Sequence, residues 1–260
     1  VMLELYGEQF NSRFILGTAL YPSIEIMLEA IDKSEADLLT VSLKRSAKNV
    51  NVKNQFWEEL KNAGCKFLPN TAGCRNSQEA IEIAEISREI FATNFIKVEV
   101  IGDDYNLQPD SVELIDACEK LVKRGFNVLP YTTDDLVIAK KLIDVGCEVL
   151  MPWAAPIGSG KGLVNPYALK VLRERFDNIK LIVDAGIGVP SQACEIMQMG
   201  YDGVLLNSAV ALAGNPASMA NAFKLAIYAG REAFKAKRMI EREIAVPSTN
   251  LVDTPFWHQY

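Results

Sequence analysis

The stretch Phe95-Ile96-Lys97-Val98-Glu99-Val100 predicts a buried β-strand, because it is rich in β-branched and aromatic residues. Successive side chains of a strand point to opposite faces, so Phe95, Lys97 and Glu99 share one face and aliphatic side chains line the other. Helices on both sides of such a sheet would bury a cation and an anion. That burial is costly unless the two charges are paired or serve a function.

Lys97 is therefore a candidate for imine chemistry, since a desolvated ammonium group loses its proton more readily than an exposed one. Two other interpretations remain open at this point. Lys97 and Glu99 could form an ion pair with a purely structural role, or the strand could lie at an exposed edge of a sheet. The rest of the chain favours the catalytic interpretation.

The composition is that of a globular protein with a large core. The chain has 260 residues, of which 49% are hydrophobic. This length allows one or two domains, and α/β barrels of this size commonly form one. A formal net charge of -6 and a pI near 5.1 argue against a nucleic-acid partner. No run is long and apolar enough to span a membrane and no secretion signal is evident, so we expect a cytoplasmic protein.

The cysteines and the single histidine limit the chemistry. The cysteines are odd in number, scattered and never spaced as CxxC, which is typical of buried thiols in a reducing cytosol. His258, near the end of the sequence, is the only histidine, so a His-based metal site or a Ser-His-Asp triad is not expected. We expect no metal and no organic cofactor. The cysteines are Cys65, Cys74, Cys118, Cys147 and Cys194.

Strand-like and helix-like segments alternate along the chain. Eight strand-like runs in about 250 residues are typical of an α/β fold of the (β/α)₈ TIM-barrel type, with a parallel core. The alternative, a doubly wound open sheet, normally has a glycine fingerprint after its first strand, where Gly17–Tyr21 stands here. We expect one barrel domain over residues 1–260, with residues 1–12 as a lead-in. Residues from about 240 to 260 would form a tail that is mobile or wraps a neighbouring chain. The runs are Phe14–Ala19, Leu38–Leu43, Lys66–Thr71, Phe95–Val100, Asn127–Thr132, Glu148–Trp153, Lys180–Ala185 and Gly203–Ser208.

Two helices have recognisable ends in the sequence. Asp110 with Glu113 resembles a capping box, and Gly125 stands where that helix should end. Thr133 is predicted to open the next helix and Gly146 to close it.

Two short loops are candidates for a phosphate site. In a barrel, the loops after strands seven and eight often hold phosphate, and here they are Asp184–Gly188 and Asn207–Ala211. Both consist of small residues and lead toward helix starts, where free N–H groups favour an anion. Alternatively, the two loops are tight turns whose residues are small for packing alone.

A third glycine-rich loop, Pro156–Gly162, follows strand six. It does not match a P-loop, because Ala155 and Gly162 stand where that pattern needs Gly and Ser or Thr. We interpret it as a flexible lip over the site, in which Gly158 lets a ligand come close. It could also be only a mobile surface loop.

Asp184 is predicted to face the barrel axis near Lys97 and Glu99, because it ends strand seven with inward parity. Two carboxylates beside an amine suit imine formation and enamine tautomerisation, in which one group delivers protons and another removes them. Alternatively, Asp184 caps the following turn.

Five segments of the chain, quoted at the end of this paragraph, closely resemble thiazole synthases of thiamine biosynthesis. They occur in order and at family-like spacing, and the resemblance extends from about residue 4 to about residue 240. They are Phe67–Cys74, Ile96–Ile101, Pro156–Gly160, Val183–Gly188 and Asp202–Ala209.

This resemblance implies a (β/α)₈ enzyme with three substrates. They are 1-deoxy-D-xylulose 5-phosphate, a glycine-derived imine (dehydroglycine), and sulfur carried as a C-terminal thiocarboxylate on a small ubiquitin-like protein. The resemblance implies that Lys97 forms the Schiff base and that Glu99 and Asp184 are the acid and base. It also implies a homo-oligomer, expected to be a tetramer, and a separate enzyme that supplies dehydroglycine. The residues that match the family's sugar-phosphate positions are Gly158, Ala185, Gly186, Asn207 and Ser208.

Two departures from the family pattern accompany the resemblance. Ser208 stands where Thr is expected, which keeps the hydroxyl group. Trp153-Ala154 stands where a smaller pair such as Leu-Gly is expected, which could change how the lip closes or how a carrier tail enters.

Two other functions remain to be weighed. A class I aldolase would use the same imine lysine on another sugar phosphate, without sulfur. A non-catalytic subunit that docks the carrier would have no use for a buried imine-forming lysine.

Overall fold

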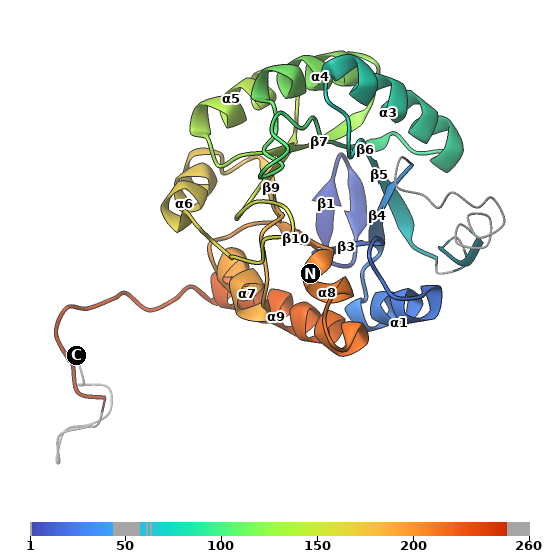
Figure 1. Cartoon of the computed structure of the whole chain (residues 1–260). Coiled ribbons are helices and arrows are strands. Elements are labelled where there is room, and N and C mark those ends of the chain that lie inside the picture. Colours follow the sequence, from blue (N-terminus) through green and yellow to red (C-terminus); the bar gives the residue numbers. More distant parts are fainter. Residues whose placement is uncertain (1, 44–57, 61, 63, 249–260) are drawn as a thin grey trace.

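A closed barrel of parallel strands surrounded by helices forms the body of the protein in the computed structural model (Figure 1). The structure describes residues 2–43, 58–60, 62 and 64–248, and within these the barrel has eight strands. They are β3 (Phe14–Gly17), β4 (Leu38–Ser42), β5 (Lys66–Asn70), β6 (Phe95–Val98), β7 (Asn127–Thr132), β8 (Val149–Pro152), β9 (Lys180–Asp184) and β10 (Gly203–Leu206).

The strand order confirms the predicted barrel and excludes the open sheet. The barrel strands pair in chain order, and β10 pairs with β3 through Leu205 and Ile15, which closes the sheet on itself. The exposed-edge interpretation of the stretch around Lys97 is wrong, because β6 lies between β5 and β7.

Side-chain alternation divides the core into two layers, as predicted from β6. Phe95 belongs to the apolar cluster inside the barrel, whereas Ile96 and Val98 pack in the layer between the sheet and the helices. Buried aliphatic side chains of this kind on both faces stabilise a parallel sheet, at roughly 1.5–3 kcal/mol for each large side chain.

The segment expected as a lead-in forms a two-stranded hairpin, β1 (Leu3–Leu5) and β2 (Glu8–Phe10). Leu3, Leu5 and Phe10 are buried in the cluster inside the barrel. The Phe10 ring meets the Phe95 ring edge-on, with centroids 5.9 Å apart. Because Phe95 begins β6, the hairpin packs at the end of the barrel where the strands start, and Figure 1 shows it within the ring of strands.

The helices begin at side-chain caps that the sequence only partly revealed. Asp110 caps its helix as predicted, but Glu113 accepts from the backbone N–H of Ser77 rather than completing a capping box. Thr133 does not open the next helix, because Asp135 accepts from the first free N–H groups and is the cap. The described helices are α1 (Ile24–Ser34), α3 (Ser77–Phe91), α4 (Ser111–Lys123), α5 (Leu136–Asp144), α6 (Pro166–Arg175), α7 (Pro190–Gln198), α8 (Ser208–Ala211) and α9 (Pro216–Ala236).

The chain beyond α9 leaves the barrel. Residues 237–248 have no regular structure, are exposed and run away from the barrel (Figure 1). The remainder of the predicted tail, residues 249–260 with His258, lies outside the described residues. No helix in the described part of the chain has the length and hydropathy of a membrane span.

Candidate active site

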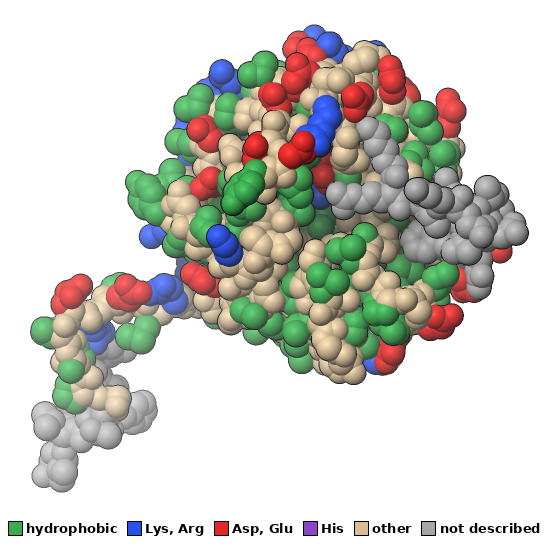
Figure 2. Space-filling view, viewed as in Figure 1, with side chains coloured by type: hydrophobic (Ala, Val, Ile, Leu, Met, Phe, Trp, Pro, Cys, Tyr) green, Lys and Arg blue, Asp and Glu red, His purple; other side chains and the backbone are tan. Residues whose placement is uncertain are grey.

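A cavity of about 670 Å³ opens at the end of the barrel where the strands finish. Its size suits a small organic ligand. On this face, charged side chains gather along the outer helices, whereas apolar and uncharged atoms surround the centre (Figure 2). All the residues predicted for catalysis or phosphate binding line the cavity. They are Lys97, Glu99, Asp184, Gly158, Ala185, Gly186, Asn207 and Ser208.

Lys97 lies between two carboxylates at the base of this cavity. Its Nζ atom is 2.9 Å from Oε1 of Glu99 and 2.6 Å from Oδ2 of Asp184. All three side chains are no more than 7% exposed. Nζ also lies 5.8 Å from the centroid of the Tyr131 ring, which supplies a further weak attraction for a cation. The prediction that Asp184 faces Lys97 and Glu99 is confirmed.

The two carboxylates reverse the expectation that Lys97 loses its proton readily. Burial by itself lowers the pKa of Lys97, but the negative charges and hydrogen bonds of Asp184 and Glu99 outweigh it and raise that pKa above its ordinary value. Burial raises the pKa of Asp184, the Lys97 charge opposes this and the Glu99 charge adds to it. Lys97 is therefore protonated while the site holds no ligand, and Asp184 is well placed to take a proton from it.

Thr71 fixes the backbone on which Lys97 and Glu99 stand. β6 ends at Val98, so Glu99 lies just beyond the regular ladder. The Thr71 hydroxyl accepts from the Glu99 N–H at 2.7 Å and donates to the Glu99 carbonyl at 2.7 Å, and the Thr71 N–H donates to the Lys97 carbonyl at 3.1 Å. A fully buried threonine thus completes the strand where both functional side chains emerge.

Thr71→Val is expected to lower kcat about tenfold or more while changing KM little. Valine keeps the shape of threonine but strands two buried backbone groups of Glu99, so the carboxylate is no longer held near Nζ. Thr71→Ser should restore most of the rate. Steady-state kinetics beside thermal unfolding would check this, and an unchanged kcat in Thr71→Val would contradict it.

Three loops meet on the side of the cavity predicted to hold phosphate. Ala185 and Gly186 both have positive φ, and a Cβ on Gly186 would lie 2.3 Å from the Ala155 nitrogen, so only glycine fits there. The predicted lip is tied to this loop, since the Gly162 N–H donates to the Gly186 carbonyl at 2.8 Å. A Cβ on Gly158 would lie in van der Waals contact with the Ser208 hydroxyl, at 3.9 Å, so Gly158 and Ser208 are neighbours in the cavity lining.

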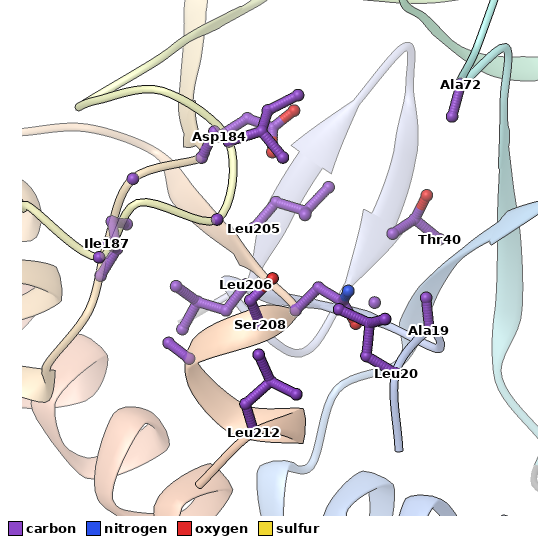
Figure 3. A pocket seen from close by; sticks show the side chains of 18 of the residues that line it. Ala19, Leu20, Thr40, Ala72, Asp184, Ile187, Leu205, Leu206, Ser208 and Leu212 are labelled. Atoms are coloured by element: carbon purple, nitrogen blue, oxygen red, sulfur yellow. The ribbon is translucent and has the colours of Figure 1, made fainter. Parts of the chain in front are cut away.

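Asn207 packs against Gly17 next to these loops. A Cβ on Gly17 would lie 2.5 Å from the Asn207 Cβ, so this glycine makes room for the asparagine. The Asn207 Oδ1 atom is buried and has no hydrogen-bond partner among the described residues. All four of Asp184, Ile187, Ser208 and Leu212 line the cavity, and in the close view Ser208 lies between Asp184 at the top and Leu212 at the bottom (Figure 3).

The Trp153-Ala154 pair does not narrow the cavity, because neither residue lines it. The Trp153 indole turns toward the loop after β7 and donates to Oδ1 of Asp134 at 3.1 Å. Ala154 is buried, and its N–H donates to the Ala185 carbonyl at 3.1 Å. The pair thus contacts the loops after β7 and β9.

Several residues that line or adjoin the site were missed in the sequence. Thr40 and Asn70 line the cavity with Lys97, and Tyr131 faces Lys97 from β7. Each has inward parity near the carboxyl end of its strand, which was the signal available to find it. No three His, Cys, Asp or Glu side chains in the described ranges come together as a metal site requires.

Comparison with known families gives one model that matches nearly the whole chain. It is described as Thiazole biosynthesis protein ThiG and matches residues 4–250. A thiazole synthase of Variovorax paradoxus (strain S110) is 52% identical over 259 residues, which cover 98% of this chain and 94% of the relative. A thiazole synthase of Burkholderia lata is 54% identical over 257 residues, which cover 99% of this chain and 95% of the relative.

Solved structures show the same barrel. One is the Amycolatopsis orientalis BexX/CysO complex, with a TM-score of 0.83, 28% identity, and coverage of 93% of this chain and 98% of the other. Another, titled Native KDPGal structure, has a TM-score of 0.61 at 15% identity and covers 86% of this chain and 98% of its own. At that identity the second similarity concerns the fold alone.

Proposed function

Because the chain belongs to the family of the thiazole biosynthesis protein ThiG, the thiazole synthases of thiamine biosynthesis, we propose that it joins three substrates in the cavity around Lys97. The substrates are 1-deoxy-D-xylulose 5-phosphate, dehydroglycine and sulfur from a protein thiocarboxylate, and the product is the thiazole phosphate carboxylate. This makes the enzyme a sulfur transferase that works through a lysine Schiff base.

One observation carries the proposal: a buried lysine lies within hydrogen-bond reach of two buried carboxylates at the base of a cavity. A structural ion pair would need only one carboxylate. With two, the group carries a net negative charge when all three side chains are ionised, and one carboxylate can receive the lysine proton.

The first steps follow from these positions. Asp184 takes a proton from Lys97, and the free amine attacks the C2 carbonyl of the sugar phosphate. Loss of water from the carbinolamine needs an acid, which the protonated Asp184 supplies. Removal of a proton from C3 to give the enamine needs a base, and Glu99, 2.9 Å from Nζ, can reach the adjacent carbon.

The phosphate of the sugar would lie at the loops after β8, β9 and β10. Gly158, Gly186 and Ser208 line the cavity together, and the Ser208 hydroxyl lies 3.9 Å from where a Cβ on Gly158 would be. Among the described lining residues the only charged side chains are Lys97, Glu99 and Asp184. The site thus relies on N–H groups and hydroxyls to bind the anion.

The carrier protein would deliver its C-terminal tail through the open end of the barrel. The similarity to BexX, which was solved as a complex with a second protein, CysO, supports docking of a protein partner by a barrel of this kind. A homotetramer and a separate enzyme that supplies dehydroglycine complete the proposal.

Reconstitution with all three substrates tests this function. The purified protein, 1-deoxy-D-xylulose 5-phosphate, dehydroglycine and a thiocarboxylated carrier should together give the thiazole phosphate carboxylate, detected by mass spectrometry. Omission of the thiocarboxylate should abolish the product. Cleavage of a sugar phosphate without any sulfur donor would instead establish the aldolase, and ligand binding with no turnover would establish the docking subunit.

A further inference from the structure

We propose that Asn70 and Thr40 form a pair of neutral hydrogen-bond donors that binds a hydroxyl oxygen on the carbon chain of the sugar phosphate held at Lys97. This rests on the proposed function and adds to it a group that distinguishes hydroxylated ketones from deoxy ones. Neither residue belongs to the acid and base groups or to the phosphate loops.

The fold places this pair next to the reacting lysine. Asn70 ends β5 and lies directly opposite Lys97 on the neighbouring strand. Thr40 lies on β4, the next strand, with inward parity. Both side chains line the cavity, although Thr40 is only 6% exposed and Asn70 only 9%. In the close view, Thr40 lies across the opening from Asp184 and Ile187 (Figure 3).

Two hydrogen bonds fix the orientation of the Asn70 amide. Its Oδ1 atom accepts from the Ala72 N–H at 3.2 Å, and its Nδ2 atom donates to the Thr40 hydroxyl at 3.0 Å. Since a backbone N–H can only donate, the oxygen of the amide must face Ala72 and the nitrogen must face Thr40.

Counting donors shows what remains for a ligand. The Asn70 amide has two N–H groups and one is used by Thr40. The Thr40 hydroxyl oxygen accepts that bond, and within the described residues its hydrogen has no acceptor. The Thr18 hydroxyl donates to the Thr40 carbonyl at 3.0 Å and thereby holds β3 beside β4. Two donors are therefore left at the cavity wall, and their natural partner is an oxygen that accepts.

The charges around the pair favour a hydroxyl oxygen over the oxygen of a carboxylate or phosphate. Lys97 is already shared by Glu99 and Asp184, and no other cation is found among the described lining residues. A carboxylate or phosphate beside Asn70 would meet the net negative charge of that group with only neutral donors to offset it. A hydroxyl oxygen has no such penalty. The first hydroxyl-bearing carbon is bonded to the ketone carbon held at Lys97, and Asn70 lies directly opposite Lys97 on the neighbouring strand, so the hydroxyl oxygen on that carbon is the one nearest this pair.

The test compares two ligands in matched variants. 1-Deoxy-D-xylulose 5-phosphate carries two hydroxyl groups between carbonyl and phosphate, and 5-phosphonooxypentan-2-one lacks both. Calorimetry would give the dissociation constant of each ligand for the full-length wild type, Thr40→Val and Thr40→Ser, with Thr40→Ala as a second variant if valine does not fold. Borohydride trapping on the same samples would report the Lys97 adduct separately.

In the wild type, the hydroxylated ligand should bind more tightly than the deoxy ligand. Thr40→Val should raise the dissociation constant of the hydroxylated ligand about threefold to tenfold, because one donor is lost. It should leave the dissociation constant of the deoxy ligand within about twofold of the wild-type value. Thr40→Ser should restore the difference in affinity between the two ligands. Equally weaker binding of both ligands, or unchanged binding of both, would overturn the donor pair. Binding without an adduct would overturn the Schiff base of Lys97 but still decide the donor pair, and no binding of either ligand would overturn both.

Discussion

Lys97→Ala is expected to abolish the borohydride-fixed adduct with 1-deoxy-D-xylulose 5-phosphate and to lower turnover more than about a thousandfold, since no other amine lines the described cavity. The measurement is the intact protein mass after incubation with the sugar phosphate and borohydride, beside the wild type. An adduct that persists in Lys97→Ala, or full activity of this variant, would show that Lys97 is not the nucleophile.

Lys97→Arg distinguishes loss of the imine from loss of the folded structure in this experiment. Arginine keeps a positive charge between Glu99 and Asp184 but cannot form an imine under these conditions. It should therefore lose the adduct and remain folded. Lys97→Ala instead strands two buried carboxylates, which should cost about 3 kcal/mol of unfolding free energy near neutral pH.

The pH dependence of stability follows from the direction of the pKa shifts. The pKa of Lys97 is raised in the folded protein. The Lys97 charge therefore contributes fully to the free energy of unfolding below about pH 10, and this contribution is lost as the pH rises further. In Lys97→Ala, nothing opposes the burial and the Glu99 charge that raise the pKa of Asp184. The variant should therefore lose stability as the pH rises from about 4, the ordinary aspartate value. Denaturant unfolding at several pH values would check both signs.

Asp184→Asn is the second change with a large expected effect: kcat should fall about a hundredfold to a thousandfold while the adduct still forms. Glu99 remains 2.9 Å from Nζ and can accept the lysine proton, but the acid that assists loss of water and the later proton transfers is missing. Trapped adduct and steady-state rate, measured on the same preparation, would show the two effects separately.

The pH profile gives an independent readout for Asp184. Because its pKa is raised, the wild-type kcat/KM should fall on the acid side at a pH above the range of an ordinary aspartate, as the carboxylate takes up a proton and stops acting as a base. Asparagine does not titrate, so this acid limb should disappear. Glu99→Gln is the matched control and should keep the limb but shift it toward lower pH, because the Glu99 charge no longer helps to raise the pKa of Asp184. An identical acid limb in Asp184→Asn would assign it to another group.

The barrel and most of the chemical groups of the site could be predicted from the sequence. Repeated strand-like and helix-like periods fixed the fold class, since side-chain periodicity is a local property of the chain. Inward parity placed Lys97, Glu99 and Asp184 on the axis for the same reason. The candidate phosphate loops, which line the cavity, were predicted from small residues at strand ends, where a barrel binds its ligands.

Tertiary structure decided the protonation of Lys97 and the roles of residues with no motif. The pKa of Lys97 depends on whether burial or nearby carboxylates dominate, and the 2.6 Å distance to Asp184, 87 positions away, arises only when β6 and β9 close into one barrel. Asn70 and Thr71 are ordinary polar residues in the sequence. They gain their positions because β5 pairs with β6 in one register, which brings Asn70 opposite Lys97 and the Thr71 hydroxyl onto Glu99. Periodicity sets which way a side chain points, whereas its neighbour across the barrel is set by strand register and closure, which are non-local.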